Sequence, residues 1–238
     1  MGVHSHALLG KAIADRAAGK TKILVRRRED GKLFDGEVDR AISPTFTKEE
    51  QQVLEYTGKR VLDLRCGAGR LLKKLSERSK DLAGLDVSPE AVAMCRRAGF
   101  DAREGDLHDP VFDGKFDSVL LFNGLIGVGG NAEGTMLLLE RLDTMLNAGG
   151  AIVGTYIDRT EAESAEDRAY YARLKSLGRA PGQAAFRYEY GSEVGEPFLL
   201  WCPTMDELTA AATDRGFGID FVQLTPGSNE CYAVLTRA

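Results

Sequence analysis

One stretch decides the fold of this chain: Val61-Leu62-Asp63-Leu64-Arg65-Cys66-Gly67-Ala68-Gly69-Arg70. Its first four residues form a short β-favouring run, and the glycines that follow predict a turn. Leu71, Leu72 and Leu75 then recur at helical spacing. A glycine turn between a strand and a helix lets a ligand approach bare backbone, where unpaired N–H groups point at it. The stretch therefore predicts a ligand-binding strand, turn and helix.

Length and charge limit the functions open to the chain. It has 238 residues, 43% of them hydrophobic, which suits one sizeable α/β core with additions rather than two full domains. The formal net charge of −5 argues against a surface built for duplex nucleic acid, which needs a clustered basic face. We therefore expect a small-molecule partner, no nucleic acid, and a monomer or homodimer.

The cysteines are scattered at positions 66, 95, 202 and 231, without a C-x-x-C pair or a neighbouring histidine. This pattern favours neither a metal site nor a disulfide framework, and it predicts a reducing cytoplasm. No apolar run approaches the roughly 20 residues that span a bilayer. The N-terminus also lacks the apolar core of a signal peptide. We expect a cytoplasmic protein with no membrane partner.

Residues 1–45 are predicted to form an N-terminal arm, and residues 46–238 the main domain. The arm holds a weak helix over 7–18 and a small hairpin that turns at Asp30-Gly31. The basic run 26–28 is followed at once by acidic residues, so it indicates a solvated hairpin edge rather than a nucleic-acid contact.

The main domain alternates strands with helices. The expected strands are 61–64, 82–87, 100–103, 116–122, 151–157, 217–224 and 231–236, and the expected helices are 47–56, one that starts at 68, 91–98, 133–146 and 204–215. Such alternation predicts a doubly wound, mostly parallel sheet. The turn Pro226-Gly227-Ser228-Asn229 suits an antiparallel pairing of the last two strands.

Residues 158–203 interrupt this alternation. They hold a charged helix over 161–177 and then two strand-like runs, 186–190 and 198–201, around a glycine turn. Ligands of open α/β sheets bind at the carboxyl ends of the strands. We expect the insertion to form a substrate cap over that edge.

Two acidic residues sharpen the prediction of a ligand. Asp86 ends the second strand, where a carboxylate can accept hydrogen bonds from both ribose hydroxyls. Asp106 follows the third strand, where it can accept from the exocyclic amine of a purine. The two acids together predict an adenosine ligand, and the group attached to its ribose would cross the glycine turn. That turn is shorter than a G-x-G-x-x-G and lacks the Lys-Ser/Thr of a phosphate loop, so a nucleotide-dependent oxidoreductase is disfavoured and the tail need not be a pyrophosphate.

In these features the sequence resembles the class I S-adenosylmethionine-dependent methyltransferase family, well over residues 45–157 and loosely elsewhere. The matching stretches are 61–70, 84–89 (Gly-Leu-Asp-Val-Ser-Pro), 104–107 (Glu-Gly-Asp-Leu) and 146–150 (Leu-Asn-Ala-Gly-Gly). The segment 121–130 also resembles a loop of bacterial family members with unassigned substrates. The resemblance implies a seven-stranded sheet in the order 3-2-1-4-5-7-6, with the seventh strand antiparallel.

The resemblance further implies S-adenosyl-L-methionine as cofactor and S-adenosyl-L-homocysteine as product. It assigns the methionine portion to Asp63 and to the backbone of Arg65, Cys66, Gly67 and Gly69. It places the ribose at Asp86 with Val87, and the adenine at Gly105, Asp106 and Leu107. Phe122 and Asn123 would then lie beside the methionine portion and the reacting methyl group.

Arg65 departs from the family pattern, which has glycine at this position. A bulky cation here either blocks the site and repels the sulfonium, or turns to the methionine carboxylate and forms a charge-assisted pair. We expect cofactor binding to be tolerated, because Asp86 and Asp106 are retained. The alternative is a methyltransferase fold that does not methylate, and that uses the aminocarboxypropyl group of the cofactor or has a binding role only.

The candidate catalytic residues are His108, Asn123 and Tyr156. His108 can act as a general base or be an ordinary loop histidine. Asn123 can orient a substrate or satisfy the turn after the fourth strand, and Tyr156 ends the fifth strand. Methyl transfer mainly needs an aligned acceptor and the exclusion of water, with a base only for a weakly acidic acceptor. The sequence therefore predicts methyl transfer to a small molecule, with O-, N- and C-methylation undistinguished.

Overall fold

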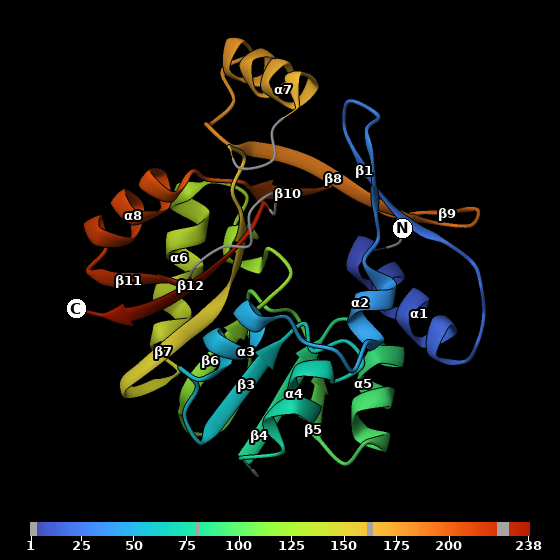
Figure 1. Ribbon diagram of the computed structural model, residues 1–238, viewed down its shortest axis with the longest axis vertical. Coiled ribbons are helices and arrows are strands. Elements are labelled where there is room, and N and C mark those ends of the chain that lie inside the picture. The colour runs from blue at the N-terminus through green and yellow to red at the C-terminus, as the bar shows by residue number, and fades with distance from the viewer. Residues whose placement is uncertain (1–3, 80, 161–163, 223–228) are drawn as a thin grey trace. The chain divides into compact units, whose positions relative to one another are not determined.

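The computed structural model describes residues 4–79, 81–160, 164–222 and 229–238 (Figure 1). The chain divides into two compact units. The first unit comprises Met1–Phe46, Lys59–Gly114 and Ala185–Phe198, and the second comprises Thr47–Gly58, Lys115–Ala184 and Leu199–Ala238. We describe the elements of each unit separately.

A seven-stranded sheet has the order β11-β12-β7-β6-β3-β4-β5. Its strands are β3 (Arg60–Leu64), β4 (Asp81–Asp86), β5 (Asp101–Glu104), β6 (Phe116–Leu121), β7 (Leu146–Ile157), β11 (Phe217–Val222) and β12 (Glu230–Arg237). Strand β12 runs antiparallel to both β7 and β11, whereas β3–β4, β4–β5 and β6–β7 are parallel pairs. Counted along the chain, this is the predicted order 3-2-1-4-5-7-6, and the doubly wound fold is confirmed.

In the first unit, helices α4 (Arg70–Leu75) and α5 (Pro89–Arg97) follow β3 and β4. The Ser88 side chain accepts a hydrogen bond from the Ala91 N–H and caps α5, and Pro89 occupies its first turn. Strand β3 is buried from Val61 to Leu64, as expected for a strand covered on both faces. The chain therefore leaves β3 and β4 at well-defined points, where the turns that follow can hold a ligand.

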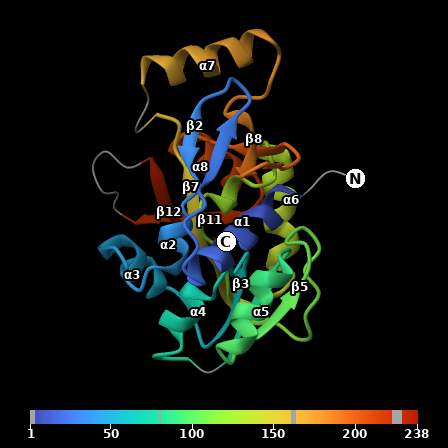
Figure 2. The same cartoon turned by 90° about the vertical axis from the view of Figure 1, so that its right-hand side faces the viewer.

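Helix α1 (Ser5–Ala17) packs against α5 and against α2 (Val38–Ile42), and Figures 1 and 2 both show α1 next to α5. Gly10 makes the approach to α5 possible. A Cβ at Gly10 would lie 2.2 Å from the Ser88 Cβ, far inside van der Waals contact. The buried Leu8 and Ala12 pack against Leu24 of the neighbouring sheet.

That second sheet is built on β1 (Leu24–Arg28). In the first unit β1 pairs antiparallel with β2 (Leu33–Asp35) and with β8 (Gln183–Tyr190), and β8 pairs with β9 (Glu193–Val194). The hairpin around Asp30-Gly31 is therefore confirmed, and strands from the predicted arm and the predicted insertion share one sheet.

The interpretation of the basic run 26–28 as a solvated hairpin edge is wrong. Strand β1 has a partner strand on each side. The Arg28 side chain is only 3% exposed and pairs with Asp30 at 2.7 Å. The Arg26 guanidinium lies over the rings of Phe34 and Phe186. Pairing with β8, more than 150 residues away along the chain, buries Arg28 and leaves Arg26 half-buried. No local pattern could indicate this.

The second unit contains α3 (Lys48–Leu54), α6 (Ala132–Asp143), α7 (Ala165–Ser176), α8 (Met205–Asp214), a short 3₁₀ turn η1 (Leu125–Gly127) and β10 (Phe198–Trp201), which begins at the boundary of the units. Thr47 and Glu50 form a capping box at the start of α3. Helix α6 ends three residues before the predicted Leu146, because the backbone pairing of Phe116 with Leu146 draws that residue into β7. Residues 161–163 of the predicted charged helix, and 226–228 of the predicted turn, lie outside the described residues.

Within the described ranges, no helix combines the length and the hydropathy needed to cross a bilayer.

We expect Gly10→Ala to lower the free energy of unfolding by about 1–3 kcal/mol, because the added methyl group overpacks the contact between α1 and Ser88. Urea denaturation followed by circular dichroism measures this change. Gly218→Ala is the matched control, since a Cβ there meets its first neighbour at an ordinary 3.6 Å, and it should change stability by less than about 0.5 kcal/mol. Equal effects of the two substitutions would contradict the close α1 contact.

Candidate cofactor site

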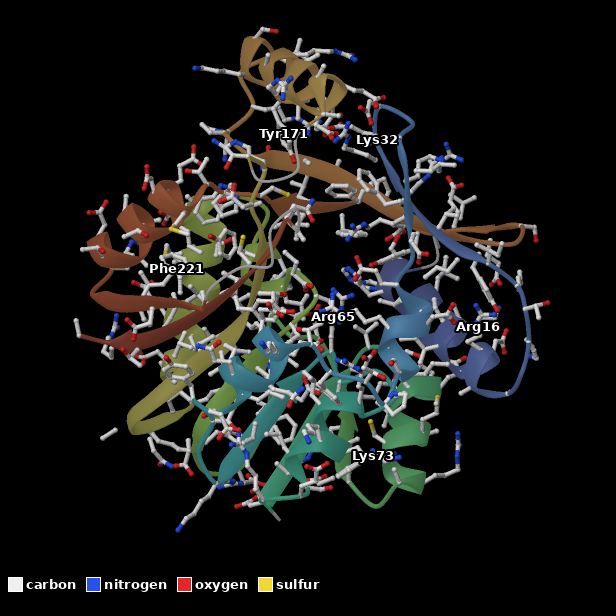
Figure 3. The ribbon with its side chains drawn as sticks, viewed as in Figure 1. Arg16, Lys32, Arg65, Lys73, Tyr171 and Phe221 are labelled. Carbon is white, nitrogen blue, oxygen red and sulfur yellow. The ribbon has the colours of Figure 1, made fainter. Side chains whose placement is uncertain are left out.

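The turn after β3 has an unusual backbone. Arg65, Gly67 and Gly69 have φ values of +60°, +54° and +77°, all in the left-handed region. Glycine adopts this conformation freely, whereas a residue with a side chain pays roughly 1–2 kcal/mol. The left-handed backbone therefore explains why the family pattern has glycine at this position. Arg65 adopts the same conformation although a side chain makes it unfavourable. Figure 3 shows the Arg65 side chain just beyond the carboxyl end of β3.

Asp86 at the end of β4 holds this turn in place. Its Oδ2 accepts a hydrogen bond from the Gly67 N–H at 2.9 Å, and its Oδ1 accepts one from the Ser88 N–H at 2.9 Å. Burial raises the pKa of Asp86, and these N–H groups and the nearby Arg65 charge partly oppose that rise. Each carboxylate oxygen has a further lone pair, so both can also accept from the hydroxyls of a ribose.

Asp63 lies one strand away and is 3% exposed. Burial, and then the negative charge of Asp86, raise the pKa of Asp63 well above its ordinary value. Two neighbouring buried carboxylates are costly without a compensating cation. This pair therefore favours a positively charged ligand group, such as an ammonium, at the end of β3.

Cys66 contributes its backbone rather than its thiol. Its Sγ lies 3.6 Å from the Cys95 Sγ, and the Cys95 thiol also lies 3.3 Å from the Gly67 carbonyl oxygen. The hydrogen bond with Cys95, together with burial, raises the pKa of the Cys66 thiol, which keeps it protonated. The two thiols pack beneath the turn, and Gly84 leaves room for them, because a Cβ there would lie 2.7 Å from the Cys66 Sγ.

The predicted adenine residues follow β5. The Gly105 N–H donates to the Asp86 carbonyl oxygen at 3.0 Å, and the Asp106 Oδ1 accepts from the His108 N–H at 2.8 Å. Leu107 is buried, while Asp106 and His108 are exposed, and Val87 after β4 is half-buried. The parallel strands β3, β4 and β5 thus bring all the predicted first-unit residues to one edge of the sheet. After β5, the apolar Leu107 lies next to the hydrogen-bond acceptor Asp106, where the adenine is predicted.

The remaining candidates lie in the second unit. Phe122 is buried and Asn123 is exposed, with a left-handed φ of +58°. Tyr156 is 0% exposed and packs against Phe221, with ring centroids 6.2 Å apart. A side chain inside the packed core cannot reach a substrate, so this geometry does not favour Tyr156 as a catalyst.

His6 was not among the residues that the sequence analysis predicted for the site. His6 on α1 is buried, and its electrostatic neighbours include Arg65 and His108. A single histidine in a weakly amphipathic helix carries no signal of its own, so only the tertiary structure reveals its place. Among the described residues, no group of three or more His, Cys, Asp or Glu side chains is arranged to hold a metal ion.

Comparison with known proteins supports the resemblance to methyltransferases. A methyltransferase-domain family model matches residues 61–150. A solved S-adenosylmethionine-dependent methyltransferase from Bacteroides fragilis, in complex with S-adenosyl-L-homocysteine, has a TM-score of 0.81 and 26% identity, covering 98% of this chain and 96% of that one. Residues 61–150 thus match a methyltransferase domain, and the chain over nearly its whole length is similar to a class I S-adenosylmethionine-dependent methyltransferase.

The curated relatives match a shorter part of the chain. The trans-aconitate 2-methyltransferase of Mycobacterium tuberculosis (strain ATCC 25177 / H37Ra) is 45% identical over 83 residues, which is 32% of each protein. The magnesium-protoporphyrin O-methyltransferase of Rhodobacter capsulatus is 32% identical over 79 residues, or 30% of this chain and 35% of that enzyme. The chain thus spans about a third of the length of these relatives.

We expect Asp63→Asn to stabilise the ligand-free protein, because the substitution removes a buried charge beside Asp86. When folding raises the pKa of an acid, the folded protein becomes less stable as the pH rises from the unfolded pKa, near 3.8, to the folded one. The stability gap between variant and wild type should therefore be small near pH 4 and grow towards neutral pH, as measured by urea unfolding at several pH values.

Asp81→Asn is the matched control, since Asp81 is exposed at the start of β4. It should show no such gap. A pH-independent gap for Asp63→Asn would contradict the raised pKa of Asp63.

Proposed function

We propose that this protein binds S-adenosylmethionine and transfers its sulfonium methyl group to a small-molecule acceptor, within enzyme class EC 2.1.1. The observation that carries the proposal is the hydrogen bond that Asp86 accepts from the Gly67 N–H. It connects the predicted ribose acceptor with the turn predicted to hold the methionine portion. The likeness to the Bacteroides fragilis protein bound to S-adenosyl-L-homocysteine, over nearly the whole chain, supports the same ligand.

The residues of the first unit fit the parts of this cofactor. Asp63 offers a buried carboxyl group whose pKa is raised by burial, and an α-ammonium group beside it would favour its charged form. Asp86 accepts from the ribose hydroxyls, and Asp106 with Leu107 receives the adenine. When bound, the cofactor supplies an electrophilic methyl group. The protein then has to orient the acceptor behind that methyl group and exclude water.

A separate general base is not required for an acceptor that is already nucleophilic. His108 and Asn123 are exposed after β5 and β6, and we propose that they orient the acceptor. We further propose a small molecule rather than a nucleic acid as acceptor, because the net charge of −5 argues against the clustered basic face that duplex nucleic acid needs. The four cysteines are free thiols, which suits a cytoplasmic setting, and we propose a bacterial-type enzyme that acts as a monomer or homodimer.

Calorimetric titration with S-adenosylmethionine and S-adenosyl-L-homocysteine tests cofactor binding, and we expect both to bind. Incubation with methyl-labelled cofactor and a small-molecule extract should then yield S-adenosyl-L-homocysteine and a labelled acceptor. Asp86→Ala serves as the control that loses the ribose contact. Failure of both cofactor forms to bind would refute the proposal.

The second candidate is a methyltransferase fold that does not methylate, and the strained Arg65 in the cofactor turn favours it. Use of the aminocarboxypropyl group would release methylthioadenosine instead of S-adenosyl-L-homocysteine. A binding-only protein would retain the cofactor and form neither product. Analysis of the products therefore separates the two candidates.

We expect Arg65→Gly to raise the free energy of unfolding by up to about 1–2 kcal/mol, because glycine adopts φ near +60° without strain. The same substitution should weaken binding of S-adenosyl-L-homocysteine about 10- to 100-fold, since it removes a charge-assisted partner of the methionine carboxylate. Urea unfolding and calorimetry measure the two effects. Unchanged or tighter binding would instead indicate that Arg65 only crowds the site.

A further inference from the structure

The turn after β6 has two successive residues in the left-handed region. Asn123 has a φ of +58° and Gly124 a φ of +75°. Glycine adopts this region freely, and asparagine is one of the few residues with a side chain that visits it. Such conformations persist only where the surrounding structure imposes them, and they concentrate at functional sites. Asn123 is also exposed, and its amide makes no hydrogen bond with the described residues.

The Thr155 side chain on β7 holds this turn. Its hydroxyl oxygen accepts a hydrogen bond from the Gly124 N–H at 2.7 Å, and Thr155 is 0% exposed. Strand β12 pairs with β7 (Figure 1), and its Glu230 accepts a hydrogen bond from the same hydroxyl at 3.0 Å. Because a hydroxyl has one proton, donation to Glu230 leaves its lone pairs for the Gly124 N–H.

The far end of the same segment is held by the insertion. A Cβ at Gly127 would collide with the Trp201 carbonyl oxygen on β10, so η1 packs directly on that backbone. The Gln183 side-chain amide on β8 donates to the Gly130 carbonyl oxygen at 3.0 Å. The segment is therefore anchored at both ends within the second unit, and Asn123 stands just before the first anchor.

We propose that Thr155 and Glu230 are positioning residues for methyl transfer, which hold Asn123 in the conformation that presents its amide to the acceptor. The inference rests on the proposed function and deepens it. Asn123 follows β6, while Thr155 and Glu230 belong to β7 and β12, so three neighbouring strands contribute. A carboxamide offers N–H donors and a carbonyl acceptor. The acceptor that it orients therefore carries a hydrogen-bonding group.

Substitutions separate the hydrogen bonds from the packing. Thr155→Val removes the hydroxyl but keeps the shape of the side chain, and Thr155→Ser keeps the hydroxyl. Glu230→Met removes the hydrogen-bond acceptor, whereas Glu230→Gln keeps a carbonyl oxygen. Asn123→Ala removes the amide itself. Thr209→Val is the matched control, because the Thr209 hydroxyl bonds to the Met205 carbonyl oxygen within α8.

We expect Thr155→Val to slow methyl transfer from labelled S-adenosylmethionine to the small-molecule extract about 10- to 100-fold, because the Asn123 amide loses its fixed position. The affinity for S-adenosyl-L-homocysteine, measured by calorimetry, should change less than about threefold, since the residues assigned to the cofactor are untouched. Thr155→Ser and Glu230→Gln should each transfer faster than Thr155→Val and Glu230→Met. Thr209→Val should transfer at the wild-type rate.

A double-mutant cycle links the effect to Asn123. If Thr155 acts through Asn123, the variant with both Thr155→Val and Asn123→Ala should transfer methyl groups no more slowly than Asn123→Ala alone. A hydroxyl that merely stabilises the fold would add its loss to that of Asn123→Ala, and this additive result would overturn the proposal. Unchanged transfer in Thr155→Val would overturn it as well.

Hydrogen exchange of the Gly124 amide, followed by NMR, tests the contact without turnover. Exchange should be at least about tenfold faster in Thr155→Val than in the wild type, and equal exchange would contradict the proposal. A wild type that transfers no methyl group refutes the proposed function, and with it any role of Thr155 in methyl transfer, even where exchange confirms the contact. The two failures therefore give different results.

Discussion

The pair of hydrogen bonds that Asp86 accepts from the backbone is the constraint on which the site depends. One bond reaches the Gly67 N–H in the turn after β3, and the other reaches the Ser88 N–H at the start of α5. A carboxylate held by two N–H groups can remain charged in a buried place only because these donors offset part of its desolvation. The pairing of β3 with β4 brings the two strand ends together, and these bonds hold the turn after β3 against the end of β4.

The charges at this edge are arranged by sign. Asp63 and Asp86 are neighbouring buried carboxyl groups beneath the turn, and the Arg65 charge acts on Asp86. The His6 Nε2 has no hydrogen-bond partner among the described residues. Each group is unfavourable alone, since burial penalises the carboxylates and leaves the imidazole nitrogen unpaired. An ammonium group of a bound ligand would relieve the cost of the carboxylates.

The second sheet explains how α1 comes to lie on the turn. Strand β1 pairs with β8, and the Ser5 hydroxyl at the start of α1 is fastened to the backbone of Tyr188 and Glu196. The apolar side of α1 then packs on Leu24 and Tyr190. Two segments far apart in the sequence, the arm and the insertion, therefore jointly place His6 at the cofactor edge. Neither segment would do so alone, because a short hairpin or a single helix is only marginally stable by itself.

The sequence alone determined the main sheet, and it predicted a cofactor edge at the ends of its strands. Periodicity located each strand to within a few residues, and the intervals from the glycine turn to Asp86 and Asp106 selected an adenosine ligand, because such signals are local and repeat along the chain. Only the tertiary structure decided the pairing of β1 with β8, the burial of Arg28 and Tyr156, and the position of His6. This pairing and these buried positions depend on contacts between residues distant in sequence. The sequence around a side chain does not indicate which distant segment will pack against it.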